Sequence, residues 1–256
     1  MIQNRPIGVF DSGIGGLTAM KELIKLLPNE DIIYFGDTAR VPYGSHSRET
    51  IIRYAKQDLS FLLNKNVKAV LVACGTVSAN AMDALRAMTD ISIIGVINAA
   101  AAKAVQKTKK KKTAILATSA SINSKAYSTA IHRYDPSVQT IEKACPLFVP
   151  LIENGYADCD NPITQMVVKD YLRDIVLSGA DTLILGCTHY PFLKRSISAV
   201  LPDVRLIDGN LGTARQLRRV LENNDLISDA ASGDVELYSS RPDMIKVMKD
   251  LLMSEI

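Results

Sequence analysis

The sequence lacks the long apolar segments that membrane and secreted proteins carry. No apolar run approaches the roughly 20 residues that a membrane-spanning helix requires. The first ten residues, MIQNRPIGVF, contain neither the basic region nor the apolar core of a secretory signal. We therefore expect a cytoplasmic protein with no membrane partner.

Paired cysteines are absent as well. The four cysteines show no C-x-x-C spacing, which argues against a zinc site and, in a reducing compartment, against a disulfide framework. We expect no bound metal, and we interpret Cys145 and Cys159 as ordinary small buried residues. The other two, Cys74 and Cys187, leave thiol chemistry open.

The chain also lacks a strong charge of one sign. Thirty basic and 27 acidic residues give a formal net charge of +3. Most of this charge could come from one run, KTKKKK at residues 107–112, which we interpret as a solvated loop or helix end, so no nucleic-acid partner is expected. A hydrophobic content of 47% and a charged content of 22% are typical of globular proteins, and the length suits one large α/β domain or two lobes.

Short apolar runs alternate with helical patterns along the whole chain. This alternation predicts an α/β protein with doubly wound parallel sheets. The long helices expected from these patterns include residues 76–88, 162–178, 191–201 and 211–223. Strands are expected at residues 7–10, 31–35, 69–73, 93–97, 113–117, 138–142, 182–185, 204–207 and 235–239.

Two of the predicted strands end in a thiol. VLVACGT places Cys74 after one apolar run, and DTLILGCTHYP places Cys187 after another, with Pro191 suited to the first turn of the next helix. Ligands of open α/β sheets bind outside the carboxyl ends of the strands, so both thiols are expected at a site. The repeat suggests two similar lobes with the active site in the cleft between them. We predict an N-terminal lobe of residues 1–97 plus 211–256 carrying Cys74, and a C-terminal lobe of residues 98–210 carrying Cys187.

Two loops add polar groups. The turn DSGIGG after the first strand matches neither the dinucleotide fingerprint nor a P-loop. Asp11 in it would repel a phosphate and attract an ammonium group, which favours an amino acid as ligand, although a simple turn role for Asp11 is an equal alternative. The long loop GDTARVPYGSHS carries Pro42, Tyr43 and Gly44, a turn that offers a phenol and a backbone N–H to a ligand or lies on the surface.

Two chemistries suit such thiols. At a helix N-terminus the pKa of a thiol is expected to fall toward neutrality. A single activated thiol, Cys187 with His189 as base, would form a thioester. Two thiols on opposite sides of a small zwitterion would instead suit inversion of a stereocentre, since one base removes the proton and an acid on the other face supplies one.

Five motifs together are similar to one family. GVFDSGIGGL, YFGDTARVPYGSHS, VACGTVSAN, CPLFVPLIENG and LILGCTHYPFLK occur in this order up to about Asp208 and resemble the glutamate racemases of the aspartate/glutamate racemase superfamily. The resemblance implies two α/β lobes, no cofactor, and production of D-glutamate for bacterial cell-wall peptidoglycan. A homodimer is also expected.

The resemblance also implies roles for individual residues. Cys74 would take the α-proton of one enantiomer and Cys187 that of the other, with Asp11 and His189 assisting and Glu153 beside His189. The residues implied to hold the substrate, besides Asp11 and His189, are Ser12, Pro42, Tyr43, Gly44, Gly75, Thr76, Thr118, Ser121 and Thr188.

One position departs from the family pattern. The family usually has Asn after the first cysteine, where this sequence has Gly75, so we expect altered affinity rather than lost activity. The Ser/Thr loop that contains Thr118 and Ser121 also differs from the usual version. The alternatives are therefore a racemase for aspartate or another amino acid, and a non-catalytic amino-acid-binding protein.

Overall fold

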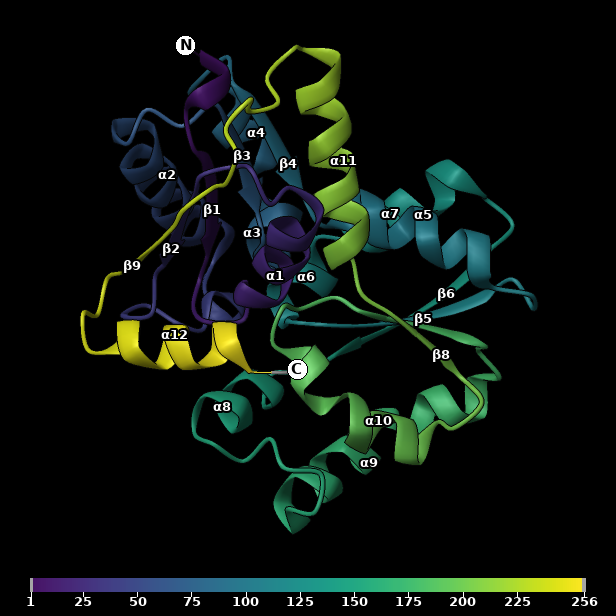
Figure 1. The fold of residues 1–256 in the computed structure, drawn as a ribbon. Helices are drawn as coiled ribbons and strands as arrows, with labels where there is room; N and C mark the ends of the chain where they lie inside the picture. The colour runs from purple at the N-terminus through teal and green to yellow at the C-terminus, as the bar shows by residue number, and fades with distance from the viewer. Residues whose placement is uncertain (1, 255–256) are drawn as a thin grey trace.

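The computed structural model describes residues 2–254 and contains two parallel β-sheets (Figure 1). Every strand pair in both sheets is parallel, as predicted. The five-stranded sheet of the N-terminal lobe has the order β4 (Ser92–Gly95), β3 (Ala69–Val72), β1 (Ile7–Asp11), β2 (Ile32–Gly36), β9 (Val235–Ser239). The four-stranded sheet of the C-terminal lobe has the order β6 (Gln139–Ala144), β5 (Lys112–Ala117), β7 (Thr182–Leu185), β8 (Arg205–Ile207).

The two sheets share one topology. The order β2-β1-β3-β4 in the first corresponds to β6-β5-β7-β8 in the second, and β9 extends the first sheet beyond β2. The strands that precede the two thiols, β3 and β7, therefore occupy equivalent positions in different sheets. This arrangement agrees with the duplication suggested by the sequence repeat.

Helices connect the strands and cover both sheets. Short 3-10 turns occur at η1 (Ile2–Asn4), η2 (Tyr43–Ser45) and η3 (Tyr190–Leu193). The α-helices are α1 (Leu17–Leu26), α2 (Arg48–Asn64), α3 (Gly75–Asn80), α4 (Met82–Arg86), α5 (Ile97–Lys107), α6 (Ser119–Asn123), α7 (Ala126–Tyr134), α8 (Phe148–Glu153), α9 (Pro162–Ser178), α10 (Lys194–Val200), α11 (Asn210–Asn223) and α12 (Met244–Met253).

Successive side chains of a strand point to opposite faces of the sheet, so each sheet packs against one hydrophobic cluster on each face. In β1, Val9 lies in the cluster with α1, α11 and α12, whereas Phe10 lies in the cluster with α2. In β7, Leu183 packs with α9 and α10, whereas Ile184 packs with α5 and α7. Both faces of the central strands are therefore buried, which explains their unbroken apolar runs.

The chain passes between the lobes twice. Ala100 and Ala104 of α5 belong to the same cluster as Ile184 of the second sheet, whereas Leu217 and Leu221 of α11 belong to the cluster of the first sheet. Helix α5 thus packs against the second sheet and helix α11 against the first. Helices α5 and α11 contact each other at this junction.

Several predicted boundaries are wrong. Residues 76–88 form two helices, because the backbone leaves helical geometry at Ala81. The strand predicted at residues 93–97 ends at Gly95, and residues 191–201 divide into η3 and α10. Glu153, expected in a loop, ends helix α8.

The lysine run forms a tight turn before β5. The backbone N–H groups of Lys109 and Lys110 both donate to the Asp181 carboxylate, and Lys111 forms an ion pair with Asp135. The exposed Lys109 and Lys110 side chains lie in solvent, in agreement with the solvated-loop interpretation.

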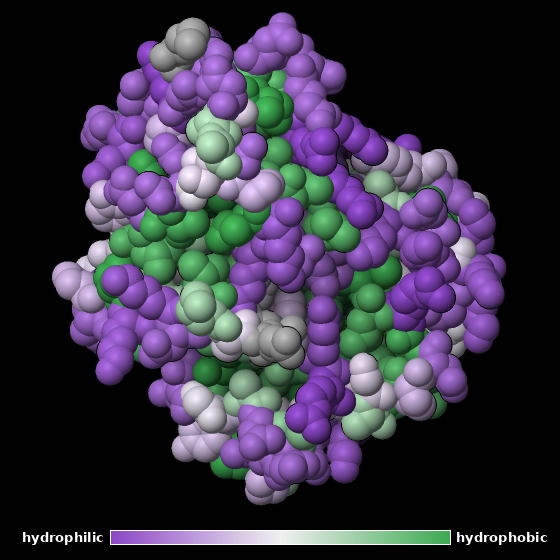
Figure 2. All heavy atoms as spheres, viewed as in Figure 1, coloured by the Kyte–Doolittle hydropathy of each residue, from purple (hydrophilic) through white to green (hydrophobic). Residues whose placement is uncertain are grey.

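The surface is mostly polar on the face shown in Figure 2. Hydrophobic residues on this face gather beside β9 and over β5 and β8, as comparison with Figure 1 shows. Within residues 2–254, none of the helices combines the length and the apolar character needed to span a bilayer.

Candidate active site

Asp11 ends strand β1 and is completely buried. Its Oδ2 accepts hydrogen bonds from the N–H groups of Gly13 and Gly16, each at 3.1 Å, so it organises the glycine-rich turn as the structural alternative anticipated. Its Oδ1 accepts a hydrogen bond from Thr188 Oγ1 at 3.2 Å, which connects it to the opposite lobe. Burial raises the pKa of Asp11, while His189 and the two N–H groups act in the opposite direction.

Cys74 follows β3 and caps the N-terminus of α3. It is 3% exposed, and its Sγ lies 3.5 Å from Ser12 Oγ, within hydrogen-bonding distance. Burial raises the pKa of the Cys74 thiol to about 12, and Asp11 adds to the increase. The expectation of a lowered thiol pKa is therefore wrong for Cys74, because α3 is one short helix of six residues and desolvation outweighs its dipole.

Cys187 is half-buried and stands beside a histidine–carboxylate pair. Its Sγ lies 3.9 Å from His189 Nδ1, and His189 Nε2 lies 2.6 Å from Glu153 Oε1. Burial lowers the pKa of His189, but Cys187 and Glu153 outweigh burial and raise this pKa to about 10. The charged form of His189 is therefore favoured, and its Nδ1 faces the Cys187 sulfur.

A chain of hydroxyl groups crosses from one lobe to the other. Thr76 Oγ1 of α3 lies 2.9 Å from Thr118 Oγ1, which in turn lies 2.9 Å from Ser121 Oγ. Thr118 is also the N-cap of α6, accepting a hydrogen bond from the Ser121 N–H. These buried hydroxyls are suited to binding a carboxylate.

The two lobes also approach each other where neither has a side chain. A Cβ at Gly75 would lie 2.3 Å from the carbonyl oxygen of Gly186 and 3.2 Å from the hydroxyl of Tyr127. Tyr127 of α7 donates a hydrogen bond of 3.0 Å to that same carbonyl, directly before Cys187. Gly75 thus permits a backbone contact that the family's usual Asn would obstruct in this arrangement.

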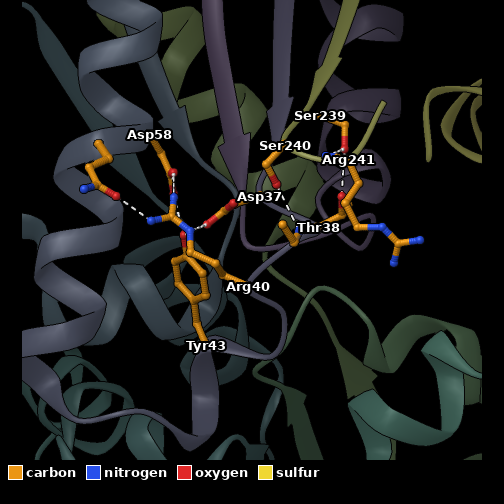
Figure 3. A network of polar contacts seen from close by, with 10 residues as sticks. Asp37, Thr38, Arg40, Tyr43, Asp58, Ser239, Ser240 and Arg241 are labelled. Atoms are coloured by element: carbon orange, nitrogen blue, oxygen red, sulfur yellow. Dashed lines mark hydrogen bonds and ion pairs between the residues drawn. The ribbon is translucent and has the colours of Figure 1, made fainter. Parts of the chain in front are cut away.

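The predicted turn at Pro42, Tyr43 and Gly44 also contacts the opposite lobe. A Cβ at Gly44 would lie 2.3 Å from Thr118 Cβ, so this glycine is required for close approach. The phenol of Tyr43, however, points into its own lobe, where it donates a hydrogen bond to the carboxylate cluster of Asp37 and Asp58 (Figure 3). The backbone of the turn, rather than the phenol, is left at the cleft.

Several of the predicted site residues contact one another, and two cysteines lie outside these contacts. Contacts link Asp11 to Thr188, Cys74 to Ser12, Cys187 to His189, and His189 to Glu153. Cys145 lies in the hydrophobic cluster of the C-terminal lobe, as predicted. The prediction of a buried residue is wrong for Cys159, which is only partly buried and lies beside Asp158 and Asp160 with ligand atoms within 4.8 Å of one another.

Sequence reasoning missed Tyr127 and Asp58. Tyr127 belongs to a helix whose buried residues have the spacing of a core face, so its hydroxyl gave no local signal. Asp58 lies on α2 among charged residues, although it is 1% exposed.

Residues 7–217, well over half of the chain, match the family described as Asp/Glu/Hydantoin racemase. The chain belongs to the Asp/Glu/hydantoin racemase family. This confirms the resemblance recognised in the sequence motifs.

Within the family, the chain is similar to curated glutamate racemases. The one from Geobacter metallireducens is 46% identical over 224 residues, which cover 87% of this chain and 82% of that protein. The one from Neisseria meningitidis serogroup B is 44% identical over 240 residues, covering 93% of this chain and 88% of that protein.

Solved structures give the same result. The glutamate racemase of Francisella tularensis in complex with D-glutamate is 41% identical, with a TM-score of 0.91 over 99% of this chain and 95% of that one. Isoform RacE1 of glutamate racemase from Bacillus anthracis is 34% identical, with a TM-score of 0.93 over 99% of this chain and 96% of that one. An aspartate racemase homologue from Pyrococcus horikoshii, 14% identical with a TM-score of 0.59, shares the fold.

Proposed function

We propose that this chain interconverts L- and D-glutamate without a cofactor, by proton transfer between the α-carbon and two cysteines. The observation that carries the proposal is the placement of Cys74 and Cys187 after equivalent strands of two sheets, in lobes joined by the Asp11–Thr188 hydrogen bond. The identity of 44 to 46% with curated glutamate racemases supports glutamate as substrate.

The proposed reaction needs one thiolate and one thiol. The thiolate removes the α-proton from one face, and its S–H bond forms as the C–H bond breaks. The thiol on the other face then gives its proton to the α-carbon and becomes a thiolate. Atoms and charge balance within one turnover, and the two cysteines exchange protonation states, so each serves one enantiomer as base.

Residues near the two thiols support the proposed proton transfer in different ways. His189, held by Glu153, forms an ion pair with a thiolate at Cys187. Asp11 already accepts three hydrogen bonds, so we assign it the tasks of holding Thr188 and supplying negative charge near the substrate ammonium group. Ser12 contacts Cys74 and steadies its thiol.

Hydroxyl and backbone groups bind the two substrate carboxylates in this proposal. Thr76, Thr118 and Ser121 form a hydroxyl chain with exchangeable donors. The remaining donors are the backbone N–H groups of Tyr43, Gly44 and Gly75, whereas the Thr188 hydroxyl donates to Asp11. Because Gly75 has no amide side chain, its backbone N–H replaces the contact that Asn would give.

The proposal also covers the lobe boundaries, the cellular location and the oligomeric state. We assign residues 1–97 plus 211–256 to the lobe of Cys74 and residues 98–210 to the lobe of Cys187, supported by the packing of α11 and α5 in separate clusters. As the family resemblance implies, the D-glutamate would supply peptidoglycan synthesis in the cytoplasm, and the protein would act as a homodimer.

Circular dichroism of L-glutamate incubated with the protein, without pyridoxal phosphate, tests this function. The expected result is decay of the signal to zero as the racemic mixture forms. Cys74→Ser and Cys187→Ser should each lower the rate by about 10²- to 10⁴-fold, the usual contribution of an acid–base group. Cys159→Ser serves as the control, since Cys159 lies outside the site.

The same assay separates the alternatives. A flat trace with L-glutamate but decay with L-aspartate would select an aspartate racemase. Flat traces with both amino acids, together with measurable binding of glutamate, would indicate a binding protein.

A further inference from the structure

A buried cluster of two carboxyl groups, one guanidinium and one phenol lies behind the Pro42–Gly44 turn (Figure 3). Asp37 follows β2 and is 0% exposed, Asp58 of α2 is 1% exposed, and Tyr43 is 1% exposed. Arg40 from the same loop reaches both carboxyl groups. None of these side chains contacts the thiols, so the proposed proton transfer does not account for the cluster.

The hydrogen bonds of this cluster require one more proton than two carboxylates allow. The Tyr43 hydroxyl is within hydrogen-bonding distance of Asp37 Oδ2 and, at 2.9 Å, of Asp58 Oδ2. A phenol has one hydrogen to donate. If both carboxyl groups were ionised, one of the two contacts would place oxygen lone pairs against each other.

Charge balance requires the same proton. Arg40 donates from Nε to Asp37 and from Nη2 to Asp58 Oδ1 at 3.2 Å. One guanidinium and two carboxylates would leave a net negative charge where water is excluded, which is unfavourable. One proton on a carboxyl group makes the cluster neutral.

Asp37 Oδ2 accepts from both Arg40 Nε and the Tyr43 hydroxyl, whereas Asp58 Oδ2 contacts only the Tyr43 oxygen, so Asp58 is the proton carrier. Several charged and polar groups surround Asp58. They are Asp37 and Arg40 from the loop after β2, Tyr43 from η2, and Asp11 at the end of β1. Burial and the charge of Asp37 raise the pKa of Asp58 to about 8, although the hydrogen bond from Tyr43 and the charge of Arg40 lower it.

We propose that Asp58 is a protonated positioning residue: it donates a hydrogen bond to Tyr43 Oη, Tyr43 donates to Asp37, and this relay fixes the Pro42–Gly44 turn against the opposite lobe. The inference rests on the proposed function in one respect, namely that this turn meets the substrate. The relay itself does not depend on a bound substrate.

The turn is held on both sides, as this role requires. On its own lobe, Thr38 Oγ1 lies 2.7 Å from Ser239 Oγ and the Ala39 N–H donates to Ser240 Oγ at 2.9 Å, which ties the loop to the end of β9 (Figure 3). On the other lobe, Val41 packs against the hydrophobic cluster of α8, α9 and α10, and Gly44 abuts Thr118.

Thermal unfolding as a function of pH tests the proton without any substrate. The folded protein holds the proton between pH 3.8, the ordinary carboxyl pKa, and about pH 8, so the wild type loses stability as pH rises through this window. Asp58→Asn keeps a neutral donor and removes the titration. Its Tm relative to the wild type should therefore increase from pH 5 to pH 8 and stay constant above.

The matched control is Asp170→Asn, which removes an exposed carboxylate whose partner is Arg173. The difference in Tm between Asp170→Asn and the wild type should not change with pH in this way. If Asp58→Asn tracks the wild type at a constant offset from pH 5 to pH 8.5, Asp58 is ionised in the folded state and the proposal is overturned.

Kinetics test the positioning role. Asp58→Ala should raise the KM for glutamate by about tenfold, equivalent to one misplaced substrate contact, with a smaller change in kcat. Asp58→Asn should restore most of this KM, since its amide can donate to Tyr43. Loss of kcat with unchanged KM in Asp58→Ala would contradict the role. The pH-dependent unfolding remains informative even if the protein does not racemise glutamate.

Discussion

Thr188 Oγ1 donates a hydrogen bond of 3.2 Å to Asp11 Oδ1, joining the glycine-rich turn of one lobe to the residue that follows Cys187 in the other. Asp11 is fixed by two backbone N–H groups, so the bond ties the position of Cys187 to the first strand of the N-terminal lobe. The position of Cys187 relative to Cys74 thus depends on the carboxylate of Asp11.

Thr188→Val is expected to destabilise the protein by about 1.5 to 3 kcal/mol, the usual value of a hydrogen bond to a charged group, and to lower kcat/KM. Urea unfolding and racemisation rates measure the two effects. Thr113→Val is the matched control, because Thr113 Oγ1 is buried without a partner among the described residues. Equal effects of the two substitutions would contradict the role of Thr188.

Gly75→Ala should lower kcat/KM by about 10²-fold, as expected when reacting groups are displaced by about 1 Å. Its Cβ would lie 2.3 Å from the Gly186 carbonyl oxygen, so the lobes must separate beside Cys187. Gly212→Ala, where the Cβ would meet only Ala99 Cβ at 3.0 Å, should keep the rate. Wild-type kinetics in Gly75→Ala would show that the lobes do not need this contact.

Tyr127→Phe should leave the Gly186 carbonyl without its donor, at a cost of about 1 to 3 kcal/mol in unfolding free energy. Tyr190→Phe removes a comparable buried bond of 3.1 Å to the Cys145 carbonyl. Both variants should lose stability, but only Tyr127→Phe should also lose kcat, because Gly186 adjoins Cys187. A normal kcat in Tyr127→Phe would limit this tyrosine to packing.

The His189–Glu153 pair should make stability depend on pH. The pKa of His189 is raised from 6.5 to about 10, so its stabilising contribution is complete below pH 6.5 and is lost as pH rises through 10. The Tm difference between wild type and Glu153→Gln should therefore be largest below pH 6.5 and shrink toward pH 10. A difference that does not vary with pH would argue against a charged His189.

The sequence predicted the fold class and the candidate residues that follow strands. Cys74 follows a short buried run of one sheet and Cys187 a short buried run of the other, and in each parallel sheet such positions lie at the carboxyl edge. Hydrophobic periodicity and position along the chain are sufficient to locate such residues, because the direction of a strand determines the edge of the sheet at which it ends.

Residues whose role depends on the approach of distant segments could not be predicted. Tyr127 reaches a carbonyl 59 positions away, and the buried Asp58 contacts Arg40 and Tyr43, which lie 18 and 15 positions away. The pKa of Cys74 shows the same limit: the local signal of a helix N-terminus predicts a decrease, whereas tertiary burial produces an increase. Likewise, the local sequence shows that Tyr43 carries a phenol but does not show that this phenol points into its own lobe.

The two-thiol reaction is tested most directly by following the α-hydrogen of L-glutamate in D₂O early in the reaction. If each cysteine serves one face, the D-glutamate formed first carries deuterium at the α-carbon, while unreacted L-glutamate keeps protium. Deuterium entering both enantiomers at equal rates, or D-glutamate that retains the original proton, would show a single base and contradict the account.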